Sequence, residues 1–326
     1  MSFSTKVKDE LSLHISKARH CRVAELGAIL STGARISLAP ALIEVQSEHK
    51  ALVLKTETYL RDLFHIHPLV LRRIGRGGSK VRLYLLRVQG DGPVRRILSE
   101  CGFLEGGVLR EMMPDQYLTR ACCRRAYLRG AFLAGGSIND PTKNYHIEIL
   151  NDTRKEAERL QEFLADYEVG SRILERSRQG TSRITDVLYL KDSEQIVDVL
   201  RIMKAPLALM ELENVRVEKD VKNRIQRRVN CEAANINKTV EASVRQSQAI
   251  GYLMSEGLFS GLPDELKEIA ELRMEYPDMA LKDLGVLVDP PISKSGVNHR
   301  LKKIIQISEE HKERKERHAG NTSDRR

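Results

Sequence analysis

The chain has 326 residues, of which 41% are hydrophobic and 30% are charged, so it can form two or three globular domains without covalent cross-links. No apolar run approaches the roughly 18 residues that span a bilayer, and no secretory signal opens the sequence. The net charge of +9 favours a polyanionic partner such as nucleic acid. Proteins that bind single strands usually stack the bases on aromatic side chains, and this chain has no Trp and only 5% aromatic residues, so duplex DNA is the better fit. We expect a cytoplasmic, nucleoid-associated protein with no cofactor and no small-molecule substrate.

The five cysteines do not form a recognisable metal or disulfide motif. Cys122 and Cys123 are adjacent, and no CxxC pair occurs. We therefore expect neither a disulfide framework nor a zinc site. His20 and Cys21 could contribute to a metal site, but the sequence favours reduced thiols ahead of a helix.

The first part of the chain predicts the order helix, two strands, helix, two strands, helix, preceded by a helix over residues 6–14. The expected helices cover residues 22–31, 51–64 and 94–101, and the expected strands cover residues 34–38, 42–46, 69–74 and 80–88. A glycine-rich loop at residues 75–78 precedes a strand, which favours a hairpin turn over a phosphate-binding loop. The basic residues around this turn are candidates for contacts to a DNA backbone: Arg72, Arg73, Arg76 and Lys80.

The second part of the chain repeats this order. The expected helices cover residues 120–134, 153–167 and 193–202, and the strands lie near residue 137 and over 145–150, 171–176 and 182–190. Gly27 and Gly33 correspond to Gly130 and Gly136, in each case 103 residues further on. Because glycine lacks a Cβ atom, the two glycine-containing helices can approach closely. We predict a saddle-shaped, duplicated αββαββα domain of the α+β class over residues 1–206, with repeats at about 1–103 and 104–206.

The composition changes after Pro206. Residues 207–237 predict a basic linker helix, whose helical pattern is broken by Asn230, Asn235 and Asn237. Its cations are further candidates for backbone contacts: Lys222, Arg224, Arg227 and Arg228. Residues 238–310 predict an all-α helix-turn-helix domain, and residues 311–326 predict a fraying charged tail.

The helix-turn-helix signal is strongest over residues 280–307. A short helix stops at Asp289-Pro290-Pro291, and Ser293 occupies the N-cap position of the next helix. That helix places Val297, Leu301 and Ile304 on one face. Its other side carries the candidate DNA-binding residues: Ser293, Lys294, Ser295, Asn298, His299, Arg300, Lys302 and Lys303. These features are typical of a recognition helix, although an ordinary amphipathic helix with a solvated basic face is the alternative.

Base recognition gives some of these side chains specific expected roles. Asn298 is suited to bond adenine edges, and Lys294 or Arg300 to reach guanine or a phosphate.

The two glycine helices resemble the motif helices of the LAGLIDADG homing endonuclease fold. In that family each motif helix normally ends in an acidic residue, and the two acids hold divalent metal over the scissile phosphates. The corresponding residues here are Thr32 and Gly135, which cannot supply an anionic ligand. The resemblance therefore implies a nuclease fold without catalytic residues and without metal-dependent cleavage.

Three segments extend the resemblance to nearly the whole chain: YLRGAFLAGGS at residues 127–137, NCEAANINKT at 230–239 and DPPISKSGVNHRL at 289–301. They resemble the WhiA family of bacterial transcription regulators. The resemblance implies a sequence-specific regulator that binds promoter DNA and acts in cell division, chromosome segregation and, in spore formers, sporulation. RNA polymerase or another regulator is a candidate second partner.

Two other functions remain open on the sequence. One is a LAGLIDADG-type nuclease or RNA maturase with residual activity. The other is a role of the N-terminal domain in protein interaction or ligand sensing.

Overall fold

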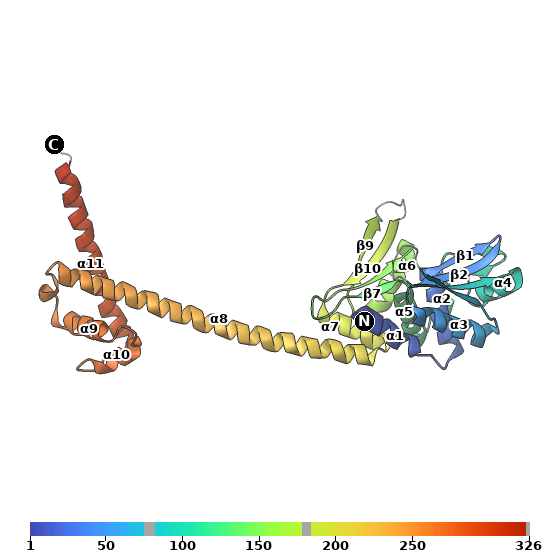
Figure 1. Cartoon of the computed structure of the whole chain (residues 1–326), viewed down its shortest axis with the longest axis horizontal. Coiled ribbons are helices and arrows are strands. Elements are labelled where there is room, and N and C mark those ends of the chain that lie inside the picture. The colour runs from blue at the N-terminus through green and yellow to red at the C-terminus, as the bar shows by residue number, and fades with distance from the viewer. Residues whose placement is uncertain (75–81, 178–183, 324–326) are drawn as a thin grey trace. The chain divides into compact units, whose positions relative to one another are not determined.

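The structure, a computed structural model of the whole chain, describes all residues except 75–81, 178–183 and 324–326. The chain forms two compact units, Met1–Asp220 and Val221–Arg326 (Figure 1). Arg76 and Lys80, which the sequence offers as backbone contacts, lie outside the described residues. No helix in the described ranges is both long enough and apolar enough to cross a lipid bilayer.

The first repeat of unit 1 has the predicted order of elements. After α1 (Phe3–Leu13), it contains α2 (Arg19–Gly33), β1 (Ala34–Leu38), β2 (Ala41–Ser47), α3 (Lys50–Phe64), β3 (Leu69–Ile74), β4 (Arg82–Gln89) and α4 (Asp91–Glu100). The strands form an antiparallel sheet in the order β1-β2-β4-β3. A short connection follows, with β5 (Leu104–Glu105), β6 (Val108–Leu109) and the 3-10 helix η1 (Asp115–Tyr117), none of which the sequence patterns indicated.

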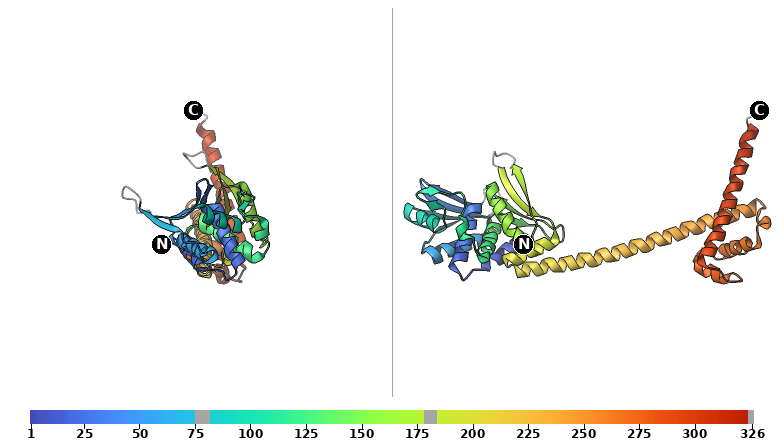
Figure 2. Two further views of the ribbon diagram at one scale, coloured as in Figure 1. Left: turned by 90° about the vertical axis from the view of Figure 1, so that its right-hand side faces the viewer. Right: turned by 180° about the vertical axis from the view of Figure 1, so that it is seen from behind.

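The second repeat has the same topology. It contains α5 (Ala121–Gly135), β7 (Gly136–Ile138), β8 (Ile147–Asn151), α6 (Arg154–Ala165), β9 (Arg172–Ser177), β10 (Ile184–Leu190) and α7 (Ser193–Met203). Its sheet has the equivalent order β7-β8-β10-β9. The strands of the two repeats lie on opposite sides of the α2–α5 pair (Figure 1, Figure 2). The duplicated α+β fold is therefore confirmed.

Helices α2 and α5 run side by side in the same direction at the centre of this unit. Near their N-termini His20 contacts Cys123, and at their C-termini a Cβ atom added at Gly33 would lie 3.0 Å from Ala134 Cβ. At Gly130 an added Cβ would lie 2.3 Å from the Glu25 carbonyl oxygen, so this glycine is needed for the close approach. The sequence expectation was wrong for Gly27, which packs against the Met113 side chain rather than against α5.

A buried ion cluster joins the two repeats across this helix pair. The Glu25 carboxylate accepts two hydrogen bonds from Arg129 of α5, from Nε at 2.9 Å and from Nη2 at 2.7 Å. Lys55 Nζ lies 2.5 Å from the same carboxylate, and Tyr59 donates its hydroxyl to it at 2.9 Å. Burial lowers the pKa of Lys55 to about 8, an effect that the Glu25 charge partly offsets. At neutral pH the carboxylate therefore faces two buried cations.

Unit 2 is helical. Helix α8 (Pro206–Ser255) runs into it from unit 1 and is followed by η2 (Phe259–Gly261), α9 (Asp264–Glu275), α10 (Leu281–Leu287) and α11 (Lys294–Ser323). A separate apolar core holds these helices together, with Ile250, Leu253, Ile269 and Leu284 at its centre.

The helix break expected at Asn230, Asn235 and Asn237 does not occur, because α8 is continuous through all three. Asparagine costs a helix interior only about 0.7 kcal/mol relative to alanine, and these positions are exposed. Bonds between residues four apart support the helix here, including that from Gln226 to Asn230 and the ion pair of Arg228 with Glu232.

The charged tail that was expected to fray over residues 311–326 is instead helical as far as Ser323, the last residue of the described range. Two contacts help to hold this part of the helix: Lys315 pairs at 2.7 Å with Glu256, which directly follows α8, and Arg317 pairs with Glu313 one turn away. Ion pairs of this kind can therefore support a helical segment that has no continuous apolar stripe.

We expect Gly130→Ala to lower the free energy of unfolding of unit 1 by about 2–3 kcal/mol, because its methyl group would collide with backbone rather than with a movable side chain. Urea denaturation measures this. The matched control is Gly92→Ala in α4, where an added Cβ meets nothing within 4 Å. Equal urea midpoints for the two variants would contradict the close approach of α2 and α5.

We expect Glu25→Gln to destabilise unit 1 by about 3–5 kcal/mol, because it leaves the buried Arg129 and Lys55 charges without their anion. The control is Glu158→Gln, which removes an exposed ion pair with Arg154 and should cost no more than about 1 kcal/mol. The same denaturation experiment separates the two. A small effect of Glu25→Gln would show that the cluster does not depend on the carboxylate charge.

Candidate nucleic-acid interface

Thr32 and Gly135 face each other at the C-terminal ends of α2 and α5. They are the residues that the resemblance to the LAGLIDADG fold aligns with catalytic acids. A Cβ atom added at Gly135 would lie 2.7 Å from Thr32 Cγ2 and 2.6 Å from the carbonyl oxygen of Leu150. An acidic side chain at residue 135 would therefore collide with the present packing. The Thr32 hydroxyl oxygen is buried, and within the described residues it has no hydrogen-bond partner.

An open groove lies beside this pair of positions. Its lining mixes cations, anions and neutral polar groups: Lys8, Arg35, Glu44, Gln46, Ser47, Glu48, His49 and Asp152. Burial lowers the pKa of Lys8 to about 8 and also lowers that of His49. Glu44 is held by Arg87 of β4 at 2.7 Å. In the described part of the chain the carboxylates of this groove do not gather into a group that could hold a metal ion.

The candidate backbone-contacting arginines of unit 1 are only partly described. Arg72 is exposed on β3, where it lies opposite Tyr84 of β4. Arg73 is in the same strand, and Arg76 and Lys80 fall outside the described residues. The corresponding strand of the second repeat, β9, carries the exposed Arg172. That strand also carries Arg176, which stands 103 residues after Arg73, so a comparison of the two repeats would have identified Arg176.

The segment that was predicted to be a linker is part of α8, and its four basic candidates are all exposed: Lys222, Arg224, Arg227 and Arg228. Arg224, Arg227 and Arg228 are spaced three and four residues apart, so they lie on one face of the helix. Arg228 is paired with Glu232 at 3.0 Å, and Arg227 donates to the backbone oxygen of Asn223.

The helix-turn-helix is built as the apolar pattern predicts. Val297, Leu301 and Ile304 are at most 1% exposed and pack in the core of unit 2. Ser293 caps α11, since its hydroxyl accepts a hydrogen bond from the Gly296 amide at 3.2 Å. The N-terminal end of α11 is thereby fixed, and with it the direction in which the polar face points.

Most of the candidate DNA-binding side chains lie on the exposed face of α11. Asn298 is half-buried, and five others are exposed: Lys294, Ser295, His299, Lys302 and Lys303. Arg300 differs from the sequence expectation. Its Nη2 lies 3.4 Å from Glu265 Oε2 of α9, and its side chain is 20% exposed, so it packs back onto α9.

A basic groove next to the start of α11 was not predicted from the sequence. Lys238, Lys282 and Lys294 line it, together with the buried Arg273 of α9. Arg273 Nη1 donates to the backbone oxygens of Pro277 and Met279, which holds the connection between α9 and α10. A signal for Arg273 existed: it continues the apolar stripe of Leu266, Ile269 and Ala270 at helical spacing, which marks an arginine on a buried face.

Comparison with known proteins agrees with this architecture. Three family models match successive parts of the chain: the WhiA N-terminal LAGLIDADG-like domain at residues 19–104, the WhiA LAGLIDADG-like domain at 124–222 and the WhiA C-terminal HTH domain at 225–308. The molecule thus combines a duplicated LAGLIDADG-like domain with a helix-turn-helix domain.

Whole-chain relatives show the family. The "Probable cell division protein WhiA" of Desulforamulus reducens is 38% identical over 323 residues, which are 98% of each chain. The protein of the same name from Alkaliphilus oremlandii is 41% identical over 316 residues, 94% of this chain and 97% of that one. The chain belongs to the WhiA family. The crystal structure of full-length DUF199/WhiA from Thermatoga maritima, at 21% identity, covers 95% of this chain and 99% of its own with a TM-score of 0.56, which shows the shared fold.

The helix-turn-helix depends on Gly285 of α10, where an added Cβ would lie 2.3 Å from the Ile292 carbonyl oxygen and 3.1 Å from Val297 Cγ2. We expect Gly285→Ala to displace the turn from α11 and to reduce amide protection in α9–α11, as measured by hydrogen exchange with mass spectrometry, while unit 1 keeps its protection. Gly251→Ala in α8, with nothing within 4 Å of the added atom, is the control and should preserve protection. Unchanged protection in Gly285→Ala would rule out this turn geometry.

Proposed function

We propose that this protein is a sequence-specific transcriptional regulator that binds duplex DNA at promoter regions through α11. The observation that carries the proposal is the division of α11 into two faces. Val297, Leu301 and Ile304 are buried in the core of unit 2. The other side of the helix carries the half-buried amide of Asn298 and the exposed imidazole and ammonium groups of His299, Lys294, Lys302 and Lys303. A helix in the major groove requires a docked apolar face and free polar groups near its N-terminus.

The surrounding charge supports backbone contacts beside base recognition. Lys238 and Lys282 lie next to Lys294 in the basic groove, so their ammonium groups are available to the phosphates that flank the bases read by α11. The exposed cations of α8 add to the same attraction. Base-specific contacts are assigned to Asn298 and Lys294, and the ion pair with Glu265 makes Arg300 a positioning residue rather than a reader.

We further propose that unit 1 is not an enzyme. Thr32 and Gly135 supply no anionic metal ligand, and the packing at Gly135 leaves no room for an acidic side chain. Two-metal or single-metal phosphodiester cleavage needs carboxylate oxygens at that place. The LAGLIDADG-like domain then serves as a scaffold for binding, and RNA polymerase or another regulator is the candidate protein partner.

The biological role is proposed from the relatives. Curated relatives over nearly the whole chain carry the name "Probable cell division protein WhiA". We assign the regulator to the control of cell division and chromosome segregation and, in spore-forming lineages, of sporulation, and we place its action at the nucleoid.

Two substitutions on α11 test the DNA-binding mode. Asn298→Ala should relax the sequence preference, because it removes a base-specific amide at a cost of about 1–3 kcal/mol. Lys302→Ala should weaken binding to all sequences and reduce the salt slope by about one. Lys267→Ala, which removes the same charge from α9 where it pairs with Asp264, is the control and should change neither property. Binding of the full chain to duplex libraries at several salt concentrations measures all three.

The outcomes that overturn the proposal are distinct. Binding that is insensitive to salt, or equal in wild type and Lys302→Ala, would remove α11 from the interface. Nicking of supercoiled plasmid in Mg²⁺ or Mn²⁺ would show a residual nuclease, and a preference for structured RNA over duplex DNA would indicate a maturase.

A further inference from the structure

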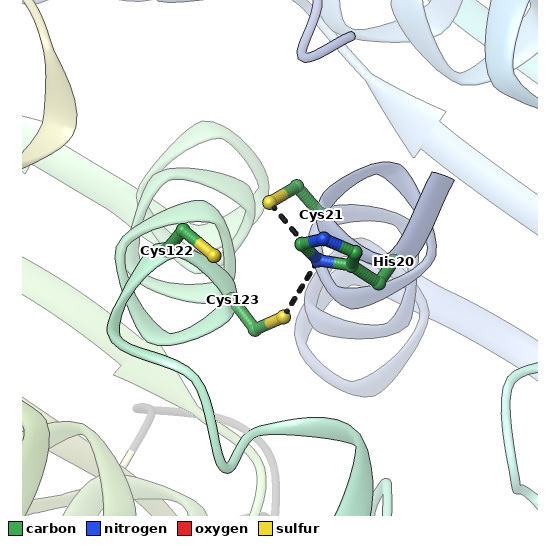
Figure 3. A group of neighbouring side chains, drawn as sticks. All are labelled: His20, Cys21, Cys122 and Cys123. Carbon is green, nitrogen blue, oxygen red and sulfur yellow. Dashed lines mark hydrogen bonds between the residues drawn. The ribbon is translucent and has the colours of Figure 1, made fainter. Parts of the chain in front are cut away.

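Four potential metal ligands meet where the first turns of α2 and α5 face each other. His20 and Cys21 come from α2, and Cys122 and Cys123 come from α5 (Figure 3). One ligand atom from each lies within 4.8 Å of the other three. His20 Nδ1 is 3.2 Å from Cys123 Sγ and 3.4 Å from Cys21 Sγ. Among the residues that the structure describes, this is the one such group of histidine, cysteine and acidic side chains.

The duplication explains why these residues meet. His20 and Cys123 are 103 residues apart, the same separation that relates the two glycine helices, so they occupy equivalent positions in the two repeats. Because α2 and α5 run in the same direction, equivalent positions at their N-termini lie next to each other. The cluster is therefore at the opposite end of the helix pair from Thr32 and Gly135.

We propose that this cluster binds a single Zn²⁺ through the thiolates of Cys21, Cys122 and Cys123 and through Nδ1 of His20. Three thiolates with one imidazole form a donor set that zinc takes in structural sites. In a tetrahedral zinc site the ligand atoms are about 3.8 Å apart between sulfurs and about 3.6 Å apart between nitrogen and sulfur. The distances from His20 Nδ1 to Cys123 Sγ and Cys21 Sγ are already close to this separation. The remaining ligand atoms need to move together by about 1 Å at most.

The chemistry of binding is balanced by proton release. Zn²⁺ replaces the S–H protons of the three cysteines, and it forms three Zn–S bonds and one Zn–N bond while those protons go to solvent. The resulting site has a net charge of about −1, which is stabilised by the positive N-terminal ends of α2 and α5.

The role of the site follows from its ligands and its place. All four coordination positions are filled by protein, so no position is left for water or substrate, and the site is structural rather than catalytic. The ion would link the two repeats at the N-termini of their central helices. Cys21 and Cys123 are buried, whereas His20 is exposed, so the metal can reach the cluster from the His20 side.

Cobalt substitution tests the site directly. The full-length protein, with thiols reduced and any affinity tag removed, is titrated with Co²⁺. We expect uptake of about one ion per chain, with thiolate-to-cobalt charge-transfer bands and the intense d–d bands of tetrahedral coordination. Zn²⁺ should displace the cobalt and raise the melting temperature of unit 1. X-ray absorption of the zinc-loaded protein should show a first shell of mostly sulfur.

Variants separate this site from other thiols. Cys123→Ser and His20→Ala should each weaken metal binding at least about tenfold, and His20→Cys should retain the metal with the spectrum of an all-thiolate site. Cys231→Ser, which changes an exposed cysteine of α8, is the control and should bind as wild type. If Cys123→Ser fails to fold, the exposed His20 position still provides the test.

Three results would overturn the proposal. They are no stoichiometric metal uptake by the reduced wild-type protein, uptake that is as strong in His20→Ala as in wild type, and uptake that is lost in Cys231→Ser.

Discussion

The contact between α2 and α5 determines the arrangement of unit 1, because each repeat packs its sheet and outer helices around one of these two helices. A single apolar core includes residues of both repeats, such as Leu26, Ile29, Tyr127 and Phe132. Within that core Glu25 is bound by Arg129 from the other repeat and by Lys55 and Tyr59 from its own. A buried charge that is satisfied only when α2 and α5 are correctly aligned disfavours any sliding of one repeat along the other. The close approach at Gly130 acts in the same way, since the backbone contact exists at one alignment only.

The same helix pair has different chemistry at its two ends. At the C-terminal end, Thr32 and Gly135 pack closely against each other, and the Leu150 backbone lies beside Gly135. At the N-terminal end, His20 and three cysteines bring together donor atoms suited to zinc. On the proposal that unit 1 is not an enzyme, this interface needs no open coordination position and no access for a phosphodiester, so its packing can be closed at both ends.

Local patterns were sufficient for the elements and for much of the helix-turn-helix, because apolar periodicity reports which face of an element is buried. The burial of Val297, Leu301 and Ile304 and the cap at Ser293 follow from spacing within one helix. Contacts between distant residues could not be read in this way. The local pattern around Glu25 and Cys21 does not identify their partners in α5; the 103-residue repeat brings the two helices together but does not specify these side-chain contacts. The ion pair of Arg300 with Glu265 likewise depends on how α11 crosses α9, and the continuity of α8 depends on neighbouring side chains rather than on asparagine propensity.

The distribution of charge separates the proposed tasks of the two units. From Lys294 to Ser308, α11 carries five basic residues if His299 is counted with the lysines and arginine, and no acidic one; its first acid is Glu309. The groove beside Thr32 instead contains both acids and cations, and its acids are Glu44, Glu48 and Asp152. Because phosphate binding scales with the number of cations that replace counterions, a mixed surface contributes little salt-dependent affinity, whereas a uniformly basic one contributes strongly. We therefore expect most of the DNA affinity to come from unit 2. Unit 1 is a duplicated scaffold, and its mixed-charge groove is better suited to a partner with charges of both signs than to a nucleic-acid backbone.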